Sequence, residues 1–364
     1  PAALLVVLAT TILIVAKNEK INNTNSIFMK GFIKLGDYSY SIYLTHFPII
    51  VLVNYSPFGG TKLGFDNLWS LTVIVILTII SSYVLYNYVE RLRYKENIKF
   101  SVIGIAFSCI ILSLYGSYFN SLKYTKKELA IYKAWEDRDQ YRCGKINRII
   151  NPTSKICKLG EVASNNKVLL LGNSHADSLK AVFVEIMNKK GISTYFYVAN
   201  NPLMSKKHNE YIVFNELLIK KIETVVIHFS TSFFNINENR KKLNSFLKLM
   251  NEAKIDVFFI APVPNYNVHV PKSLLKQLND SKYQSPTKYV SEYYSDNSNF
   301  FKFINNNFID DFFIFYPHLI MCSNAKCKYQ DESIPYYFDG GHLTLTGARG
   351  LSSLFDKLTL ILEK

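Results

Sequence analysis

Two long apolar runs in the first 120 residues constrain the fold of this 364-residue chain more than any other feature. Leu68 to Val89 and Phe100 to Phe119 contain no charged side chain, and each is close to the roughly 20 residues that a helix needs to cross a bilayer. Pro1 to Ala16 and Tyr38 to Val53 are shorter candidates. We therefore expect residues 1–120 to form four membrane-spanning helices.

The start of the chain indicates that further spans precede it. The first residue is Pro rather than Met, and the first apolar run has no flanking residues. A cleaved signal peptide would also give such a start, but it does not predict the apolar runs that follow. We therefore expect this chain to be the C-terminal part of a longer membrane protein.

The basic residues between the spans predict their orientation, because short loops rich in Lys and Arg tend to stay in the cytoplasm. The first and third loops are basic, whereas the second loop, Tyr55 to Asn67, has only Lys62. The first loop carries Lys17, Lys20, Lys30 and Lys34, and the third carries Arg91, Arg93, Lys95 and Lys99. This alternation places the second loop, and everything from about Ser121 onward, outside the cytoplasm.

Four of the five cysteines lie in the part expected outside. Cys143 with Cys157, and Cys322 with Cys327, form two close pairs, and an oxidising compartment would allow both pairs to bridge. A metal site is the other interpretation of four cysteines, but these spacings lack the CxxC pattern of zinc sites. We expect two disulfides and no metal centre.

The net charge of +14 raises the question of a nucleic-acid partner. The basic residues are spread over the flanks of the membrane spans and over surface helices rather than gathered in one motif. A solvated Lys-rich surface explains them, with some of them at the anionic head groups of the bilayer. We therefore expect a lipid bilayer as a partner and no nucleic acid.

From Lys167 onward, predicted strands alternate with predicted helices, a pattern that favours a parallel sheet with helices on both faces. The charged segment Ser121 to Arg142 has apolar residues at helical spacing and is predicted to be a juxtamembrane connector. We expect membrane helices over 1–120, a linker over 121–160 and an α/β domain over 161–364. The five strands are Lys167 to Leu171, Thr194 to Val198, Thr224 to Phe229, Asp256 to Ala261 and Phe312 to Tyr316, and the helices include Ala176 to Lys189, Tyr211 to Ile222 and Lys241 to Ala253.

The stretch LLLGNSHAD, residues 169–177, places Ser174 on the turn between the first of these strands and its helix. Sites in parallel sheets lie at the carboxyl ends of strands. The first N–H groups of a helix have no internal partners, so an oxyanion beside Ser174 would be stabilised there. The alternative is that Asn173 or Ser174 only caps the helix.

The stretch YFDGGHLTLTGARGL, residues 337–351, supplies the other groups that a hydroxyl nucleophile requires. Asp339 and His342 are three residues apart, close enough for the carboxylate to hold one imidazole nitrogen while the other removes a proton from Ser174. Asp-Gly-Gly is also common turn chemistry, and Thr344 is a suitable helix cap. His175 is a competing base, but its place next to Ser174 makes it difficult for its ring to reach back.

GNSHAD together with DGGHLTLTGA resembles the first and last blocks of the SGNH (GDSL-like) esterase family. LGDYSYSIYLTHFPII at residues 35–50, followed by a span ending in YVERLR, looks like the last part of the acyltransferase-3 membrane domain. Together they resemble the fused surface-polysaccharide O-acetyltransferases of the bacterial inner membrane. The resemblance implies a flavodoxin-like α/β/α sandwich on the periplasmic side, with Ser174 as nucleophile, His342 as base and Asp339 as its partner.

The same resemblance implies an acyl donor and an acceptor. The membrane domain of the family is thought to bring an acetyl group from cytoplasmic acetyl-CoA to the outer face, where the SGNH domain assists its transfer to a sugar hydroxyl. The acceptor would be lipopolysaccharide O-antigen or another cell-envelope polysaccharide, and no cofactor would be tightly bound. The upstream spans that carry the proposed membrane His and Arg residues of the family are not part of this chain.

Several features depart from the family pattern. Asn173 replaces the usual Asp before the nucleophile, and the oxyanion-hole Gly and Asn blocks are not evident in VANNPLM or IHFSTSFF. The Ser174 amide is the first choice of oxyanion donor, with Asn173, Asn200 and Asn201 as weaker candidates. APVPNYNVHVP, residues 261–271, resembles the loop after the fourth strand in the fused proteins. The alternative is that its prolines only mark an ordinary loop.

Three functions are consistent with these residues. An O-acyltransferase would pass the acyl group from Ser174 to a sugar hydroxyl, whereas a carbohydrate acetyl esterase would use the same three residues to release acetate. A glycan-binding domain without catalysis is the third. His46, in the predicted span Tyr38 to Val53, is either functional or part of an aromatic belt with Tyr40, Tyr43 and Phe47.

Overall fold

The computed structural model describes residues 11, 27–56, 60–61, 68–90, 124–150, 155–197, 199, 201–307 and 314–363. The chain divides into two compact units, Pro1–Phe119 and Asn120–Lys364. The predicted spans over residues 1–16 and 100–119, with Cys109, lie outside the described residues, apart from Thr11.

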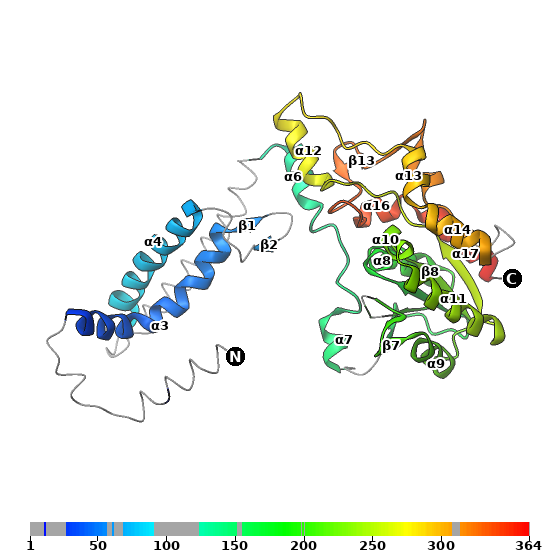
Figure 1. The fold of residues 1–364 in the computed structure, drawn as a ribbon, viewed down its shortest axis with the longest axis horizontal. Helices are drawn as coiled ribbons and strands as arrows, with labels where there is room; N and C mark the ends of the chain where they lie inside the picture. The colour runs from blue at the N-terminus through cyan, green and yellow to red at the C-terminus, as the bar shows by residue number, and fades with distance from the viewer. Residues whose placement is uncertain are drawn as a thin grey trace. The chain divides into compact units, whose positions relative to one another are not determined.

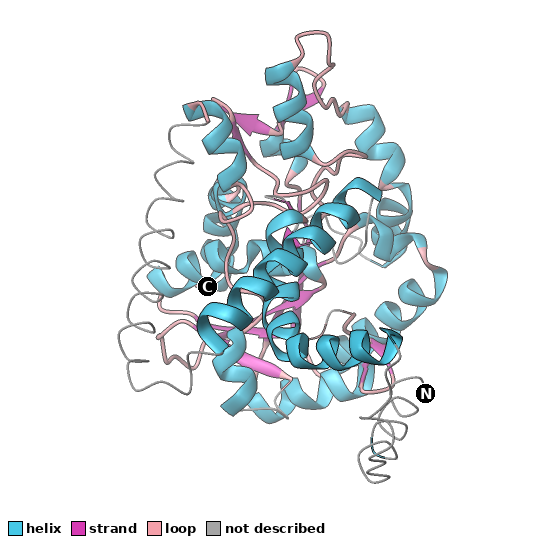
Figure 2. Ribbon diagram, turned by 90° about the vertical axis from the view of Figure 1, so that its left-hand side faces the viewer, coloured by secondary structure: helices cyan, strands magenta, loops and turns pink. Residues whose placement is uncertain are grey.

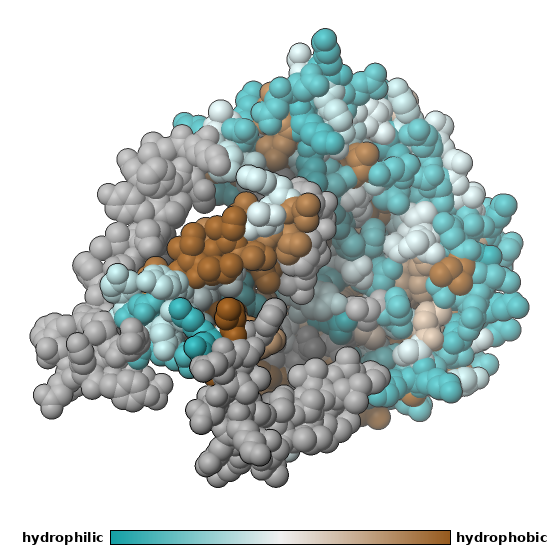
Figure 3. Space-filling view, turned by 60° about the vertical axis from the view of Figure 1, so that its left-hand side comes forward, coloured by the Kyte–Doolittle hydropathy of each residue, from teal (hydrophilic) through white to brown (hydrophobic). Residues whose placement is uncertain are grey.

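The first unit contains two helices that overlap two of the predicted spans. These are α3 (Ile27–Val53) and α4 (Leu68–Leu85), the latter continued by the π-helix η1 (Tyr86–Glu90), with a short hairpin of β1 (Tyr55–Ser56) and β2 (Gly60–Thr61) between them. The first helix begins at Ile27, not near Tyr38, so Lys30 and Lys34 lie in this helix and not in the predicted first loop. Among the described residues, Leu68–Glu90 is the one helix long and apolar enough to cross a membrane. Its apolar side chains are largely exposed, and the first unit shows an extended hydrophobic surface (Figure 3).

Polar side chains connect α3 to α4 and η1. Thr45 Oγ1 lies 2.8 Å from Ser82 Oγ, and Ser41 Oγ donates to Glu90 Oε2 at 2.7 Å. Such interhelical hydrogen bonds are typical of helix pairs in an apolar medium. Pro48 lies inside α3, and His46 Nδ1 lies 2.8 Å from the carbonyl oxygen of Tyr43 one turn earlier.

The second unit, coloured green to red in Figure 1, is built on a six-stranded sheet. Its strand order is β10-β9-β8-β4-β5-β3. Five strands are parallel, as expected: β4 (Lys167–Gly172), β5 (Ser193–Tyr197), β8 (Thr224–His228), β9 (Asp256–Ile260) and β10 (Ile314–Phe315). The sixth strand, β3 (Ile156–Leu159), pairs antiparallel with β5 and corrects the prediction of a five-stranded parallel sheet. It is only four residues long and lies in the segment predicted to be a linker, so it gives little periodic signal.

Helices line both faces of the sheet (Figure 2). One core cluster joins α9, α11 and α14 to alternate strand residues such as Leu169 and Leu171. Phe183 of α8 packs on Phe355 of α17, with ring centroids 5.5 Å apart. The helices of the second unit are α6 (Lys126–Lys133), α7 (Gly144–Ile150), α8 (Ser174–Lys189), α9 (Glu210–Lys220), α10 (Thr231–Asn235), α11 (Asn237–Glu252), α12 (Val270–Asn279), α13 (Val290–Asp296), α14 (Ser298–Asn307), α15 (His318–Met321), α16 (Leu345–Arg349) and α17 (Ser352–Leu362).

The strand order creates a switch point between β4 and β8. From β4 the chain first adds β5 on one side and then β8 on the other, which is the flavodoxin-like order for the five parallel strands. Ligand sites in such sheets lie where the order reverses, beyond the carboxyl ends of the strands. The residues after Gly172 and His228 therefore meet at the place where a site is expected.

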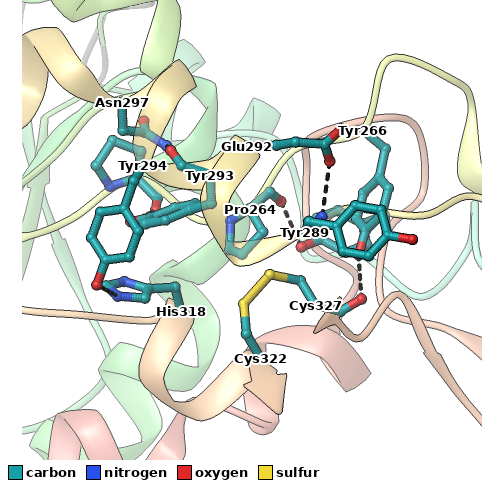
Figure 4. Close-up of a disulfide and its surroundings, with 12 residues drawn as sticks. Pro264, Tyr266, Tyr289, Glu292, Tyr293, Tyr294, Asn297, His318, Cys322 and Cys327 are labelled. Carbon is teal, nitrogen blue, oxygen red and sulfur yellow. Dashed lines mark hydrogen bonds between the residues drawn. A yellow bond between two sulfur atoms is a disulfide. The ribbon is translucent and has the colours of Figure 1, made fainter. Parts of the chain in front are cut away.

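Three short hairpins extend the second unit: β6 (Met204–Ser205) with β7 (His208–Asn209), β11 (Cys322–Ser323) with β12 (Lys326–Cys327), and β13 (Gln330–Asp331) with β14 (Ile334–Pro335). The structure contains the disulfides Cys143–Cys157 and Cys322–Cys327, which are the two pairs favoured by the sequence spacing. The second disulfide closes the β11–β12 hairpin (Figure 4).

Buried tyrosines hold the APVP loop that follows β9. Tyr293 donates to the carbonyl oxygen of Pro262 at 2.9 Å, and Tyr337 donates to that of Pro264 at 2.6 Å. Tyr266, from the end of the same loop, donates to the carbonyl oxygen of Cys327 at 2.9 Å (Figure 4). The loop after β9, the disulfide hairpin and the segment that leads to Asp339 are thereby fixed to one another.

Candidate active site

The turn after β4 requires a glycine. A Cβ atom at Gly172 would lie 1.8 Å from the carbonyl oxygen of His228 on the neighbouring strand, so no other residue fits. Asn173 then adopts an extended conformation, and its Oδ1 accepts a hydrogen bond from the N–H of His175 at 3.1 Å. This cap starts α8 at Ser174, and the serine stands on the turn between strand and helix.

Asn173 also connects the ends of β4 and β8. Its Oδ1 accepts from the N–H of Ser230 at 3.3 Å, and its Nδ2 donates to Ser230 Oγ at 2.8 Å. Because the oxygen and the nitrogen of the side-chain amide both have partners in these two segments, the structure gives Asn173 a supporting position, and its part in binding an oxyanion stays a prediction. Ser230 was missed in the sequence, where IHFSTSFF was noted only for lacking the expected block.

Ser174, His342 and Asp339 converge at this turn, although 168 positions separate the serine from the histidine. Ser174 Oγ lies 2.6 Å from His342 Nε2, and His342 Nδ1 lies 2.7 Å from Asp339 Oδ2. Gly340 lets the Asp339 loop pass close to the loop after β9, since a Cβ atom there would lie 2.6 Å from the carbonyl oxygen of Tyr266. The arrangement is that of a hydroxyl, an oriented base and a carboxylate.

The Asp339 carboxylate is held in its ionised form. Burial by itself raises the pKa of Asp339, but the hydrogen bond and charge of His342 and the N–H groups of His342 and Gly341 lower this pKa to about 2. Both N–H groups donate to Oδ1 at 2.8 Å, which leaves Oδ2 for the imidazole. Because an ionised carboxylate only accepts, the proton of the neutral imidazole is on Nδ1, and the lone pair of Nε2 is directed at Ser174.

The sequence of residues 142–357 matches the family described as "SGNH domain (fused to AT3 domains)". This match covers more than half of the chain. The chain belongs to this family. Among solved structures, it is similar to the periplasmic domain of a lipopolysaccharide acetyltransferase from Salmonella ser. Paratyphi A, at 22% identity over 56% of this chain and 85% of that chain, with a TM-score of 0.44.

A second similar structure is a putative acylhydrolase from Bacteroides fragilis NCTC 9343. Its identity is 14%, the alignment covers 62% of this chain and 100% of that chain, and the TM-score is 0.37. No curated protein matches the sequence. The family match includes β3, so this edge strand is part of the SGNH domain.

Two further histidines lie behind His342 in the SGNH domain. The ring of His175 lies 4.5 Å from the ring of His342, and burial, followed by the charges of His342 and His228, lowers the pKa of His175. His228 Nδ1 lies 3.0 Å from the carbonyl oxygen of Ile260, and burial lowers the pKa of His228 to about 4. Both rings are therefore neutral near pH 7, and His175 is a neighbour of the site.

Two aromatic rings, those of Phe338 and Trp135, form an aromatic wall beside the triad. Phe338 stacks on the His342 ring, with centroids 5.4 Å apart and planes 12° apart, and Trp135 meets Phe338 edge-on at 5.8 Å. Arg138 places its guanidinium carbon 3.7 Å from the centre of the Trp135 ring and 5.0 Å from that of Phe338. These contacts link the predicted connector to the loop that carries Asp339 and His342. Apolar spacing in the sequence indicated only that Trp135 lies on a helix face.

The Ser174 amide is the first N–H group of α8. His175 and Asp177 donate their N–H groups to the Oδ1 and the backbone oxygen of Asn173, whereas the Ser174 N–H has no acceptor among the described residues. Asn201 is exposed and makes no side-chain hydrogen bond within the described part of the chain, and Asn200 lies outside the described residues. Within the described ranges, no group of three His, Cys, Asp or Glu residues is placed to hold a metal ion.

Proposed function

We propose that this chain belongs to a membrane-bound O-acyltransferase that transfers acetyl groups to hydroxyls of lipopolysaccharide O-antigen or another cell-envelope glycan. The observation that carries the proposal is the hydrogen-bonded chain from Ser174 through His342 to Asp339 at the switch point of an SGNH domain. The choice of a glycan acceptor rests on the resemblance of the paired sequence motifs to the fused surface-polysaccharide O-acetyltransferases.

The first half of the reaction forms an acyl ester. Ser174 Oγ attacks the carbonyl carbon of the acyl donor while His342 Nε2 takes the hydroxyl proton, and Asp339 stabilises the resulting imidazolium. The Ser174 amide donates to the oxyanion of the tetrahedral intermediate at the start of α8. When the carbon–donor bond breaks, the proton moves from His342 to the leaving group, and the acyl group remains on Ser174.

The second half transfers the acyl group to the acceptor. A sugar hydroxyl takes the place of the leaving group, and neutral His342 removes its proton as the hydroxyl oxygen attacks the ester carbonyl. The bond between the acyl carbon and Ser174 Oγ then breaks, and His342 returns the proton to the serine. If water takes the place of the sugar, the same steps release acetate, so exclusion of water decides between transferase and esterase.

The membrane part supplies the donor and the location in this proposal. The family is defined by fusion of the SGNH domain to AT3 domains, and the helix Leu68–Glu90 has the length and composition of a membrane span. The full-length protein would then be a multi-pass protein of the bacterial inner membrane, with acetyl-CoA as cytoplasmic donor and the SGNH domain in the periplasm. The alternation of basic and neutral loops supports this orientation.

The proposal is tested by supplying the full chain with p-nitrophenyl acetate and purified O-antigen polysaccharide, and measuring acetylated sugar and free acetate separately. We expect acetylated sugar from the wild-type chain and its loss in Ser174→Ala. Ser245→Ala on the exposed face of α11 is the matched control, because its hydroxyl only donates to the carbonyl of Lys241 one turn earlier. Acetate without acetylated sugar would identify an esterase. Acetylation that is unchanged in Ser174→Ala would mean that Ser174 is not the nucleophile, which leaves glycan binding as the role of the SGNH domain.

A further inference from the structure

Residues 135–142, the last part of the predicted connector, form the connector segment. This segment is hydrogen-bonded to the rest of the SGNH domain along its length. Asp137 accepts from the N–H groups of Leu345 and Thr346, through its backbone oxygen at 2.8 Å and its Oδ2 at 3.1 Å. The segment predicted to be a linker is therefore a fixed part of the wall beside the triad.

A buried lysine on α8 fastens the other end of the connector segment. Lys180 forms ion pairs of 2.9 Å with both Asp139 and Asp177, and it donates to the carbonyl oxygen of Gln140 at 2.5 Å. The N–H of Arg142 donates to Asp177 Oδ1 at 3.0 Å. Since Asp177 lies in the first turn of α8, the connector segment is anchored close to Ser174.

Arg138 presents its guanidinium beside the triad in a fixed orientation. Its Nε donates to the carbonyl oxygen of Trp135 at 2.6 Å, and its planar group packs over the rings of Trp135 and Phe338. Phe338 in turn stacks on His342, so one aromatic ring separates the guanidinium from the catalytic base. The side chain is exposed, and its two Nη groups make no hydrogen bond or ion pair with any described residue.

The carboxylates of Asp339 and of the aspartates in the connector segment already have hydrogen-bond or ion-pair partners, although the charge of Asp339 still favours the charged form of Arg138. Asp339 accepts three hydrogen bonds, from His342 Nδ1 and from the N–H groups of Gly341 and His342, and Asp137 Oδ2 accepts from Thr346. Asp139 and Asp177 are bonded to Lys180. The Nη edge of Arg138 is therefore a pre-oriented donor pair that faces solvent beside the Phe338 ring, which stacks on His342.

We propose that Arg138 binds an oxyanion on the acceptor glycan, so that the acceptor is an acidic polysaccharide whose sugars carry carboxylate or phosphate groups. A guanidinium matches either group with two parallel N–H bonds, and packing on aromatic rings reduces the entropy that the side chain loses on binding. This inference rests on the proposed function, because it names the class of acceptor for the same site.

A second group of cations lies along the same edge of the sheet. The β3–β5 register pairs Ile156 with Tyr197, which places Lys155 at the carboxyl end of β5. Tyr197 contacts His208 there, and the positive charges near His208 are Lys155, Arg142 and Lys207. Because β3 is two strands from β4, this group lies about 10 Å to the side of the Ser174 turn, which suits a chain with repeated negative charges.

Binding of three oligosaccharides to the full chain in detergent tests the inference. The probes are neutral 4-linked tetragalactose, the same tetramer oxidised to tetragalacturonate, and the same tetramer phosphorylated at the 6-hydroxyls. We expect at least one acidic probe to bind about tenfold or more tightly than tetragalactose, with weaker binding at high salt. The acidic probe that binds more tightly than tetragalactose identifies carboxylate or phosphate as the recognised group.

Arg138→Gln should remove this preference, while Arg138→Lys should retain part of it because the charge remains without the planar fork. Lys133→Gln is the matched control, since it removes one exposed positive charge at the end of α6 that lies over neither the Trp135 ring nor the Phe338 ring. Equal binding of acidic and neutral probes, no binding of any probe, or equal weakening of all probes in Arg138→Gln overturns the inference. Binding needs no turnover, so loss of the proposed function would appear separately, as unchanged p-nitrophenyl acetate cleavage in Ser174→Ala.

Discussion

Replacement of Lys180 by Met should loosen the connector segment and destabilise the SGNH domain. The Lys180 ammonium is almost fully buried, with 2% of its side chain exposed, and it neutralises Asp139 and Asp177 at 2.9 Å each. Met has a similar shape but no charge, so the variant leaves two carboxylates without their shared cation. A cation removed from a buried pair costs about 3–5 kcal/mol, mostly because a charge stays buried without a partner.

The two carboxylates differ in how well water replaces the lysine. The Asp139 side chain is 30% exposed and is readily hydrated, whereas that of Asp177 is 14% exposed but keeps the N–H of Arg142 at 3.0 Å. We therefore place the cost below that of a fully buried pair, at about 2–3 kcal/mol. For a domain of this size, this corresponds to a decrease in Tm of roughly 4–12 °C.

Thermal unfolding of the full chain in detergent measures this decrease. The sequence has two tryptophans, so Trp69→Phe leaves the fluorescence of Trp135 as a probe inside the connector segment. Lys180→Met should melt earlier, and adding Asp177→Asn should recover part of the loss by removing the less hydrated charge. A Tm within about 1 °C of the parent chain would show that the lysine does not hold the connector segment.

Three further predictions concern the site and its support. Asp339→Asn should lower turnover about 10²- to 10⁴-fold in a p-nitrophenyl acetate assay, since an amide NH₂ does not accept from His342 Nδ1–H; a smaller loss would argue against an orienting carboxylate. Because the pKa of Asp339 is lowered from 3.8 to about 2, its contribution to stability is present above about pH 4 and disappears as pH falls through 2. The free energies of unfolding of wild type and Asp339→Asn, measured by denaturant titration, should therefore become equal only near pH 2. Cys143→Ser removes a cross-link between residues 14 apart and should cost about 3 kcal/mol in the same titration, whereas an unchanged midpoint would show that the bond does not constrain the unfolded chain.

The sequence was informative where strong local signals coincide. The run before Gly172 predicted a buried strand, and the change to Asn, Ser and His predicted the turn at which α8 begins. Three side chains from opposite ends of the domain were predicted to meet, and they lie within hydrogen-bonding distance of one another. Their catalytic role remains a prediction.

Other parts of the site depend on contacts that leave no periodic pattern. The strand β3 has two buried residues, Ile156 and Cys157, and its place beside β5 follows from tertiary pairing. The role of Asn173 became evident only once β8 placed Ser230 next to it, because β4 and β8 are distant in sequence. Arg138 and Lys180 look like ordinary solvated charges in the sequence, yet one packs on aromatic rings and the other is buried between carboxylates.

The central claim is that Ser174 carries the acyl group between donor and acceptor. The full chain is incubated with p-nitrophenyl acetate without acceptor, quenched in acid, digested and analysed by mass spectrometry of the peptide that contains Ser174. We expect an acetyl group on Ser174 in the wild-type chain, lost on addition of acceptor polysaccharide and absent in His342→Ala. Formation of acetylated polysaccharide by a chain whose Ser174 is never acetylated, or is replaced by Ala, would contradict this claim.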